Sequence, residues 1–234
     1  MEKLITSSYK MKISRVTPRG GTDAMYNQNV ISGISIDNDV FWGQRLLSVI
    51  DWISKRFPNC LIVIGDDLHR YNEMIFSGLQ EKEALIEGRK LGDKMLKRVE
   101  SIVEAKKMNN IKVTRWDGLS QLEEAKYTTN KIKSIFKTDE SFRNEILISC
   151  ESFLKRKSSR IPLKTTLEKA THLSAQYILE ELAVFEYLIT QGYTVQVYPG
   201  SNLPILKSIA LGRYAEHQFE LEKTILVDLK STKK

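Results

Sequence analysis

The stretch NVISGISIDNDVFWGQRLL, residues 29–47, changes its hydrophobic pattern at its centre. Its first seven residues, NVISGIS, are rich in apolar and β-branched side chains, which is typical of a buried strand. After residue 40 the apolar side chains recur at the spacing of a helix. The polar residues Asp37, Asn38 and Asp39 lie before this helix, and each can cap it. The stretch therefore predicts a strand that leads directly into a helix, as in an α/β fold.

The same alternation of strand and helix continues along the chain. Short β-rich runs predict strands at residues 9–16, 29–35, 60–66, 111–116, 193–199 and 224–229. Helical periodicity lies between them, at residues 40–56, 79–108, 119–136, 139–156, 166–191 and 203–211. Because several strands are almost continuously apolar, we expect helices on both of their faces. The predicted fold class is α/β, with a Rossmann-like, mostly parallel sheet covered by helices on both faces.

The length and composition favour a single domain. The chain has 234 residues, 41% of them hydrophobic, and a mean hydropathy of −0.30. This content can bury one core, so we expect one domain over residues 1–234, with flexible ends at 1–8 and 231–234. No run approaches the roughly 18 apolar residues that cross a bilayer, and the N-terminus lacks the apolar segment of a signal peptide. We expect a cytoplasmic protein without a membrane partner.

The charge, the cysteines and the absence of common motifs limit which ligands and cofactors we expect. The net charge of +7 and the pI of about 9.2 favour a polyanion such as nucleic acid. Cys60 and Cys150 are too few for a disulfide framework and form no C-x-x-C zinc motif. The chain also lacks the G-x-G-x-x-G, Walker and H-E-x-x-H motifs. We therefore expect no cofactor and no metal.

Ser35 falls at the carboxyl end of a predicted strand, where ligands bind in open parallel sheets. A helix N-terminus behind it would stabilise an anionic intermediate, although a serine here can also simply form a side-chain turn. The hydrolase elbow G-x-S-x-G matches Gly33 and Ser35 but has Asp37 where the second glycine is needed. Position alone therefore leaves both a nucleophilic and a structural role open.

A serine hydrolase would also need a histidine base. The chain offers His69, His172 and His217, and we expect each to be structural or exposed, with His69 in a polar loop that faces solvent. A serine nucleophile without a base requires a substrate that is already activated.

The predicted helix at 79–108 has a basic face. Its apolar stripe comprises Ala84, Leu85, Leu91, Met95, Leu96, Val99, Ile102 and Val103. The opposite side carries Arg89, Lys90, Lys94, Lys97 and Arg98. Such a face can contact a phosphate backbone, or it can merely be solvated.

A second group of polar residues lies near the end of the chain. Tyr177 and Glu181 stand four residues apart, so that a helix places the phenol and the carboxylate on one face, where they could hold an ammonium group. A core tyrosine and a surface acid would give the same spacing. Burying Glu181 without a cation would be costly, however. Tyr198 closes a predicted strand at its carboxyl end.

Together these residues resemble the cyclodipeptide synthase family in order and spacing, over residues 29–205. The matching motifs are G-x-S-x-x-N at Gly33, Ser35 and Asn38, Y-x-x-x-E at Tyr177 and Glu181, and the late pair Tyr198-Pro199. Tyr127 falls where the family places another active-site tyrosine, and the basic helix corresponds to the one that contacts tRNA. The resemblance implies a fold similar to the catalytic domain of class I tyrosyl- and tryptophanyl-tRNA synthetases, and a monomer without ATP chemistry.

The resemblance also implies a ping-pong reaction of two aminoacyl-tRNAs. Ser35 takes the first aminoacyl group as an ester, the amine of the second group attacks it, and the resulting dipeptidyl enzyme cyclises to a diketopiperazine. In this scheme Tyr177 and Glu181 anchor the α-ammonium, and Tyr198 relays protons or steadies the oxyanion. Gly33 permits close backbone approach, and Tyr127 hydrogen-bonds near the serine unless it is a core residue.

Two residues depart from the family pattern. Members with the early asparagine usually carry Tyr-His, whereas this chain combines Asn38 with Tyr198-Pro199, and we place it with the Tyr-Pro subgroup. Asn38 can orient the loop around Ser35 or only cap the helix. Ala183 stands where many members have proline. A serine esterase and a non-catalytic tRNA-binding protein are the alternative hypotheses.

Overall fold

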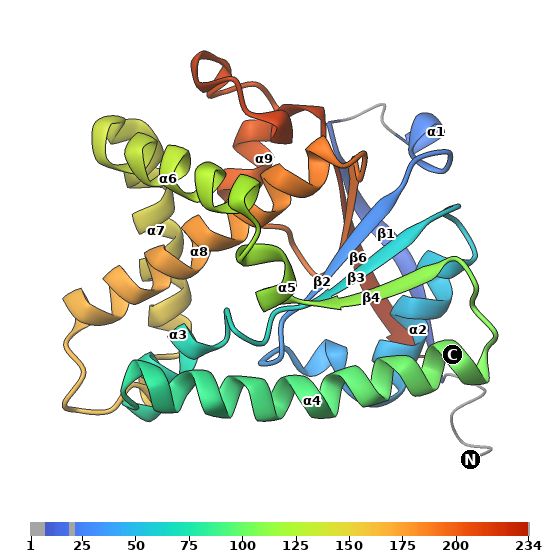
Figure 1. Ribbon diagram of the computed structural model, residues 1–234, viewed down its shortest axis with the longest axis horizontal. Helices are drawn as coiled ribbons and strands as arrows, with labels where there is room; N and C mark the ends of the chain where they lie inside the picture. Colours follow the sequence, from blue (N-terminus) through green and yellow to red (C-terminus); the bar gives the residue numbers. More distant parts are fainter. Residues whose placement is uncertain (1–7, 19–21, 234) are drawn as a thin grey trace.

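The computed structural model describes residues 8–18 and 22–233. Their centre is a six-stranded sheet in the order β1-β6-β5-β2-β3-β4 (Figure 1). The strands are β1 (Tyr9–Thr17), β2 (Val30–Ile34), β3 (Cys60–Ile64), β4 (Ile111–Arg115), β5 (Val195–Pro199) and β6 (Ile225–Lys233). Every pairing is parallel except that of β1 with β6. The predicted strands and the mostly parallel sheet are therefore confirmed.

The helices form a layer on each face of the sheet (Figure 1). One layer contains α2 (Gly43–Ser54) and α4 (Glu81–Ala105), whose apolar side chains share a core with Phe41. The other contains α6 (Glu123–Thr138), α7 (Glu140–Arg156), α8 (Leu167–Thr190) and α9 (Pro204–Ala210), around Phe185. Short helices are α1 (Thr22–Met25), α3 (Arg70–Asn72) and α5 (Trp116–Ser120). The expected cover on both faces is confirmed, and no helix in the described part of the chain is long and apolar enough to span a bilayer.

The strand order places a switch point at the middle of the sheet. From β2 the chain moves outward through β3 and β4, and it then returns to the other side of β2 to form β5. Loops that leave β2 and β5 therefore separate at their carboxyl ends, which is where open α/β sheets bind ligands. Ser35 directly follows β2, and Tyr198 is the second-last residue of β5.

Two local details differ from the expectation. The predicted helix at 40–56 begins as a short 3-10 turn, Asp39–Phe41, and α2 starts only at Gly43, whose φ of 64° turns the chain there. A three-residue turn, not the long helix, thus stands behind Ser35. Residues 231–233, expected to be flexible, pair with β1 instead, while 1–7 and 234 lie outside the described residues.

Candidate active site

A cavity of about 1360 Å³ opens at the switch point, between the carboxyl edge of the sheet and the helices α7 and α8. Its walls include six predicted site residues: Gly33, Ser35, Asn38, Tyr177, Glu181 and Tyr198. Residues that lie more than 160 positions apart in the sequence therefore meet at one site. Pro199 is buried where β5 pairs with β6, and it does not line this cavity.

Tyr177 projects from α8 toward Ser35. Burial, and next the charge of Glu181, raise the pKa of the Tyr177 phenol well above its usual range, while a hydrogen bond with Ser35 lowers it. The phenol therefore stays protonated at neutral pH and can donate a hydrogen bond to a substrate. Its ring also meets that of Tyr71 edge-on, with 6.5 Å between centroids.

Glu181 lies one helical turn beyond Tyr177 on the same face of α8. Burial raises the pKa of its carboxyl group to about 7. Its carboxylate forms no ion pair and no hydrogen bond with any residue that the structure describes. A half-buried carboxylate without a counterion favours a cation, and a substrate ammonium group would supply one.

Asn38 joins the loop after β2 to the end of β5. Its Nδ2 donates to the Tyr198 hydroxyl at 2.9 Å, and its Oδ1 accepts from the Val40 amide at 3.0 Å. The side chain therefore both caps the 3-10 turn and orients Tyr198, so the two roles considered for it are compatible. Burial raises the pKa of Tyr198, and the Asn38 hydrogen bond lowers it. Phe41 supports the ring edge-on at 5.8 Å.

The glycine at position 33 lies in tight contact with α8. A Cβ atom built there would lie 3.1 Å from Cζ of Phe185, on α8. The absence of a side chain thus allows α8 to approach β2 closely beside Ser35. This closeness brings Tyr177 and Glu181 within reach of the serine.

Tyr127 is placed differently from the prediction. It lies on α6 with 74% of its surface exposed, and it lines a separate shallow pocket with Lys131 and His217. Helix α6 turns Ala125, Ile132 and Ile135 toward the core, which leaves position 127 on the outer side. The expected position beside Ser35 is therefore wrong.

The basic face of α4 is smaller than the sequence suggested. Nε and one terminal nitrogen of Arg89 donate to the two carboxylate oxygens of Asp67, at 2.7 and 2.8 Å. Lys90 pairs with Glu87 at 2.6 Å, and Arg98 is half-buried. Within the described chain, Lys94 and Lys97 are exposed cations of α4 without an acidic partner.

The prediction that His69 faces solvent is also wrong. The side chain is 3% exposed, and its Nε2 lies 3.1 Å from Glu73 Oε1 and 3.7 Å from Asp37 Oδ1. No hydrogen bond or ion pair joins Ser35 to a histidine anywhere in the described residues. The esterase hypothesis, which needs such a base, gains no geometric support.

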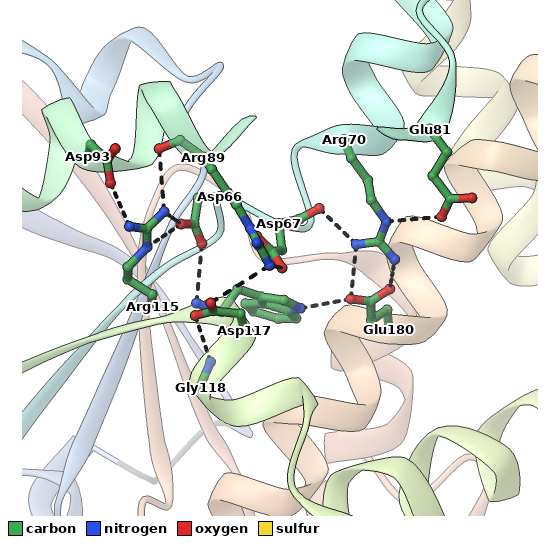
Figure 2. Close-up of polar contacts among 11 residues, drawn as sticks. Asp66, Asp67, Arg70, Glu81, Arg89, Asp93, Arg115, Asp117, Gly118 and Glu180 are labelled. Carbon is green, nitrogen blue, oxygen red and sulfur yellow. Dashed lines mark hydrogen bonds and ion pairs between the residues drawn. The ribbon is translucent and has the colours of Figure 1, made fainter. Parts of the chain in front are cut away.

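Charged residues missed from the sequence hold the walls of the site together (Figure 2). Asp66 is fully buried after β3 and bonds Arg115 Nε at 2.5 Å. On the other side, Glu180 accepts from Arg70 at 2.6 Å and from the Trp116 indole at 2.9 Å. The signal for the first cluster was the G-x-x-x-G spacing in α4. Nothing local in the sequence marked Glu180.

A group of possible metal ligands lies outside the cavity. Ligand atoms of Asp139, Glu216 and His217 are all within 4.8 Å of one another. Asp139 already accepts from the Phe142 amide as the cap of α7, and His217 Nε2 contacts its other oxygen at 2.6 Å. The contacts thus explain this cluster as a structural clasp between α7 and the segment around 217.

Known proteins share the sequence pattern and the fold of this chain. A sequence model described as cyclodipeptide synthase matches residues 13–210. A cyclodipeptide synthase structure from Fluoribacter dumoffii is similar, with 21% identity, 98% of this chain and 100% of that chain covered, and a TM-score of 0.82. No curated protein sequence matches the chain.

Two further solved structures connect the fold to tRNA. One is a Mycobacterium tuberculosis protein whose structure relates cyclodipeptide synthetases to type I tRNA synthetases, with 15% identity, coverage of 97% and 94%, and a TM-score of 0.71. The other, from Candidatus Glomeribacter gigasporarum, is a cyclodipeptide synthase bound to Phe-tRNAPhe, with 19% identity, coverage of 89% and 90%, and a TM-score of 0.59.

Proposed function

The chain belongs to the cyclodipeptide synthase family, and from this premise we propose that it joins two aminoacyl groups through an ester on Ser35. Members of this family are tRNA-dependent aminoacyltransferases that make cyclic dipeptides. The observation that carries the Ser35 proposal is the convergence of a serine, a protonated phenol and an uncompensated carboxylate in one cavity.

In the first step, Ser35 Oγ attacks the ester carbonyl of an aminoacyl-tRNA. The bond between the carbonyl carbon and the ribose oxygen breaks, and the serine proton passes to the ribose oxygen. The charged Glu181 pairs with the α-ammonium, and Tyr177 hydrogen-bonds beside it, so that the carbonyl is held against Ser35. The tRNA ester is already activated, which explains why no histidine base is needed.

The second step cannot be the one that the resemblance implies, in which the amine of the second aminoacyl group attacks the Ser35 ester. If the incoming amine attacked the Ser35 ester, the dipeptide would leave on tRNA and the serine would be free. A dipeptidyl enzyme forms only when the Ser35-bound ammonium first gives a proton to Glu181 and the free amine attacks the ester of the second aminoacyl-tRNA. The bond from that carbonyl carbon to the ribose oxygen breaks, and the ribose oxygen leaves with the second proton of the amine. The new terminal amine then attacks the Ser35 ester, which closes the ring and restores the hydroxyl. Tyr198, oriented by Asn38, returns the proton to Ser35.

The test is the mass of the intact protein after mixing with an aminoacyl-tRNA. We expect one acyl increment on the wild type, none on Ser35→Ala, and cyclic dipeptides in the medium of cells that express only the wild type. Ser32→Ala is the matched control, because Ser32 lies on β2 three residues before Ser35, is 2% exposed and does not line the cavity. Undiminished product from Ser35→Ala would contradict the proposal.

A further inference from the structure

Gln196 is a buried polar residue of β5, and it lies between two buried apolar residues. Its neighbours on β5, Val195 and Val197, are both 0% exposed, and Gln196 itself is 4% exposed. Its side-chain amide makes no hydrogen bond with any described residue, and its Oε1 is buried without a partner. Native proteins pair nearly all such groups with protein, water or ligand atoms, so this amide is available to a bound group.

The amide belongs to the same cavity as Ser35. Parallel pairing aligns Gln196 with Ile31 of β2. Side chains alternate along a strand, so Ile31, Gly33 and Ser35 share one face of the sheet, and Gln196 lies beside its deeper end. Because Ser35 and Gln196 line one cavity, an acyl group on Ser35 can extend within it toward Gln196.

Several walls of the cavity that Gln196 lines are apolar. Val63, Trp116 and Phe185 are among its lining residues, and the indole N–H of Trp116 is already donated to Glu180. Among the described residues, no acidic or basic side chain forms a hydrogen bond with the Gln196 amide. A charged substrate group would therefore be desolvated without a counterion, and an apolar group would leave the amide unpaired.

We infer that the aminoacyl group esterified to Ser35 carries a neutral side chain with a hydroxyl, carboxamide or imidazole group, which Gln196 recognises. This inference rests on the proposed function. An amide both donates and accepts, so it matches each of these groups. A site built to hydrogen-bond a substrate rejects the apolar analogue strongly, because the rejected analogue leaves a buried polar group without a partner.

The experiment measures Ser35 acylation by intact-protein mass with matched pairs of amino acids, each pair charged onto one and the same tRNA. The pairs are threonine with valine, glutamine with methionine, and tyrosine with phenylalanine, and asparagine and histidine are each compared with leucine. In the wild type we expect the polar member of at least one pair to react at least about 100-fold faster than its partner. Faster or equal reaction of the apolar member in every pair overturns the inference, while cyclic dipeptide synthesis itself still stands.

The variant Gln196→Leu tests the residue. We expect the preference to fall at least about tenfold, whereas Gln191→Leu, at an exposed glutamine after α8, leaves it unchanged. An unchanged preference in folded Gln196→Leu refutes the role of Gln196. If that variant does not fold, the wild-type pairs still decide the substrate class. If none of the charged tRNAs acylates Ser35, the proposed Ser35 ester is refuted, and the inference is refuted with it.

Discussion

Glu181 holds its charge at a cost to the folded protein. Burial raises its pKa from 4.5 to about 7, so between these pH values the folded protein keeps a proton that the unfolded chain has lost. Stability therefore falls as the pH rises from 4.5 to 7, and above 7 the charged carboxylate costs up to about 3 kcal/mol. The charged Glu181 thus lowers the stability of the folded protein, and the same charge attracts the substrate cation.

Replacing this charge should stabilise the protein and stop the reaction. We expect Glu181→Gln to raise the free energy of unfolding by up to about 3 kcal/mol at pH 8 and by almost nothing at pH 4, measured in urea. The wild-type kcat/KM should decline about tenfold per pH unit below 7, as Glu181 is protonated. A stability difference that is the same at both pH values would show that the charge is not its cause.

At the scale of the element, two glycines allow α4 to lie against the loop after β3. A Cβ built on Gly88 would be 2.6 Å from the backbone carbonyl oxygen of Asp66, and one on Gly92 would be 2.5 Å from Asp66 Cβ. We expect Gly88→Ala to lower the free energy of unfolding by about 2 kcal/mol, although alanine favours a helix by about 1 kcal/mol.

Urea denaturation measures this change, and Gly118→Ala in α5 is the matched control. The nearest atom to a Cβ at Gly118 lies 3.7 Å away, which is an ordinary contact. That variant should be as stable as the wild type or slightly more stable. An equally stable Gly88→Ala protein would mean that α4 is not held at this distance.

The resemblance to the family predicts that the outer face of α4 contacts the tRNA backbone, and we propose that Lys94 and Lys97 make this contact. Because Lys94 and Lys97 have no acidic partner within the described chain, we expect the double change to alanine to raise the KM for aminoacyl-tRNA about tenfold at low salt. The slope of log KM against log salt should decrease by about 1.5 to 2. Lys12 and Lys230, paired across β1 and β6, are a control with the same loss of charge. Equal effects of the two double variants would place the tRNA elsewhere.

At the scale of the whole molecule, Glu180 connects three helices from separate parts of the chain. It accepts from Arg70 in α3 and from the Trp116 indole in α5 (Figure 2). It also accepts from the Tyr71 hydroxyl, and it precedes Glu181 on α8. Its carboxylate thus holds α8 on a side about 100° around the helix from Glu181. The network is half-buried, so the loss of one member leaves charges without partners.

We expect Glu180→Ala to lower the free energy of unfolding by about 3 kcal/mol, because the enclosed Arg70 then loses its counterion. Glu180→Gln, which keeps an acceptor for the Trp116 indole, should lose less than half as much. Thermal denaturation of both variants measures the difference. Two variants of equal stability would mean that the acceptor for the Trp116 indole contributes nothing beyond the ion pair, and two variants as stable as the wild type would mean that the ion pair with Arg70 contributes nothing.

Much of the fold and part of the site could be predicted because both depend on local patterns. Strand and helix periodicities located all six strands, and apolar strands indicated cover on both faces. The position of Ser35 after β2 and the four-residue spacing of Tyr177 and Glu181 are equally local. The sequence predicts Asn38 as a helix cap. Its hydrogen bond to the Tyr198 hydroxyl joins positions 160 residues apart, and no local pattern at either residue predicts it.

The sequence by itself thus determined the elements, their order and which side chains share a face, since backbone geometry repeats over a few residues. Only the tertiary structure decided which polar groups meet a partner. It paired Arg89 with Asp67, buried His69, turned Tyr127 outward and left Gln196 unpaired in the cavity. These outcomes depend on packing between distant segments, and burial sets the free energy of a charge or an amide far more strongly than its place in the chain does.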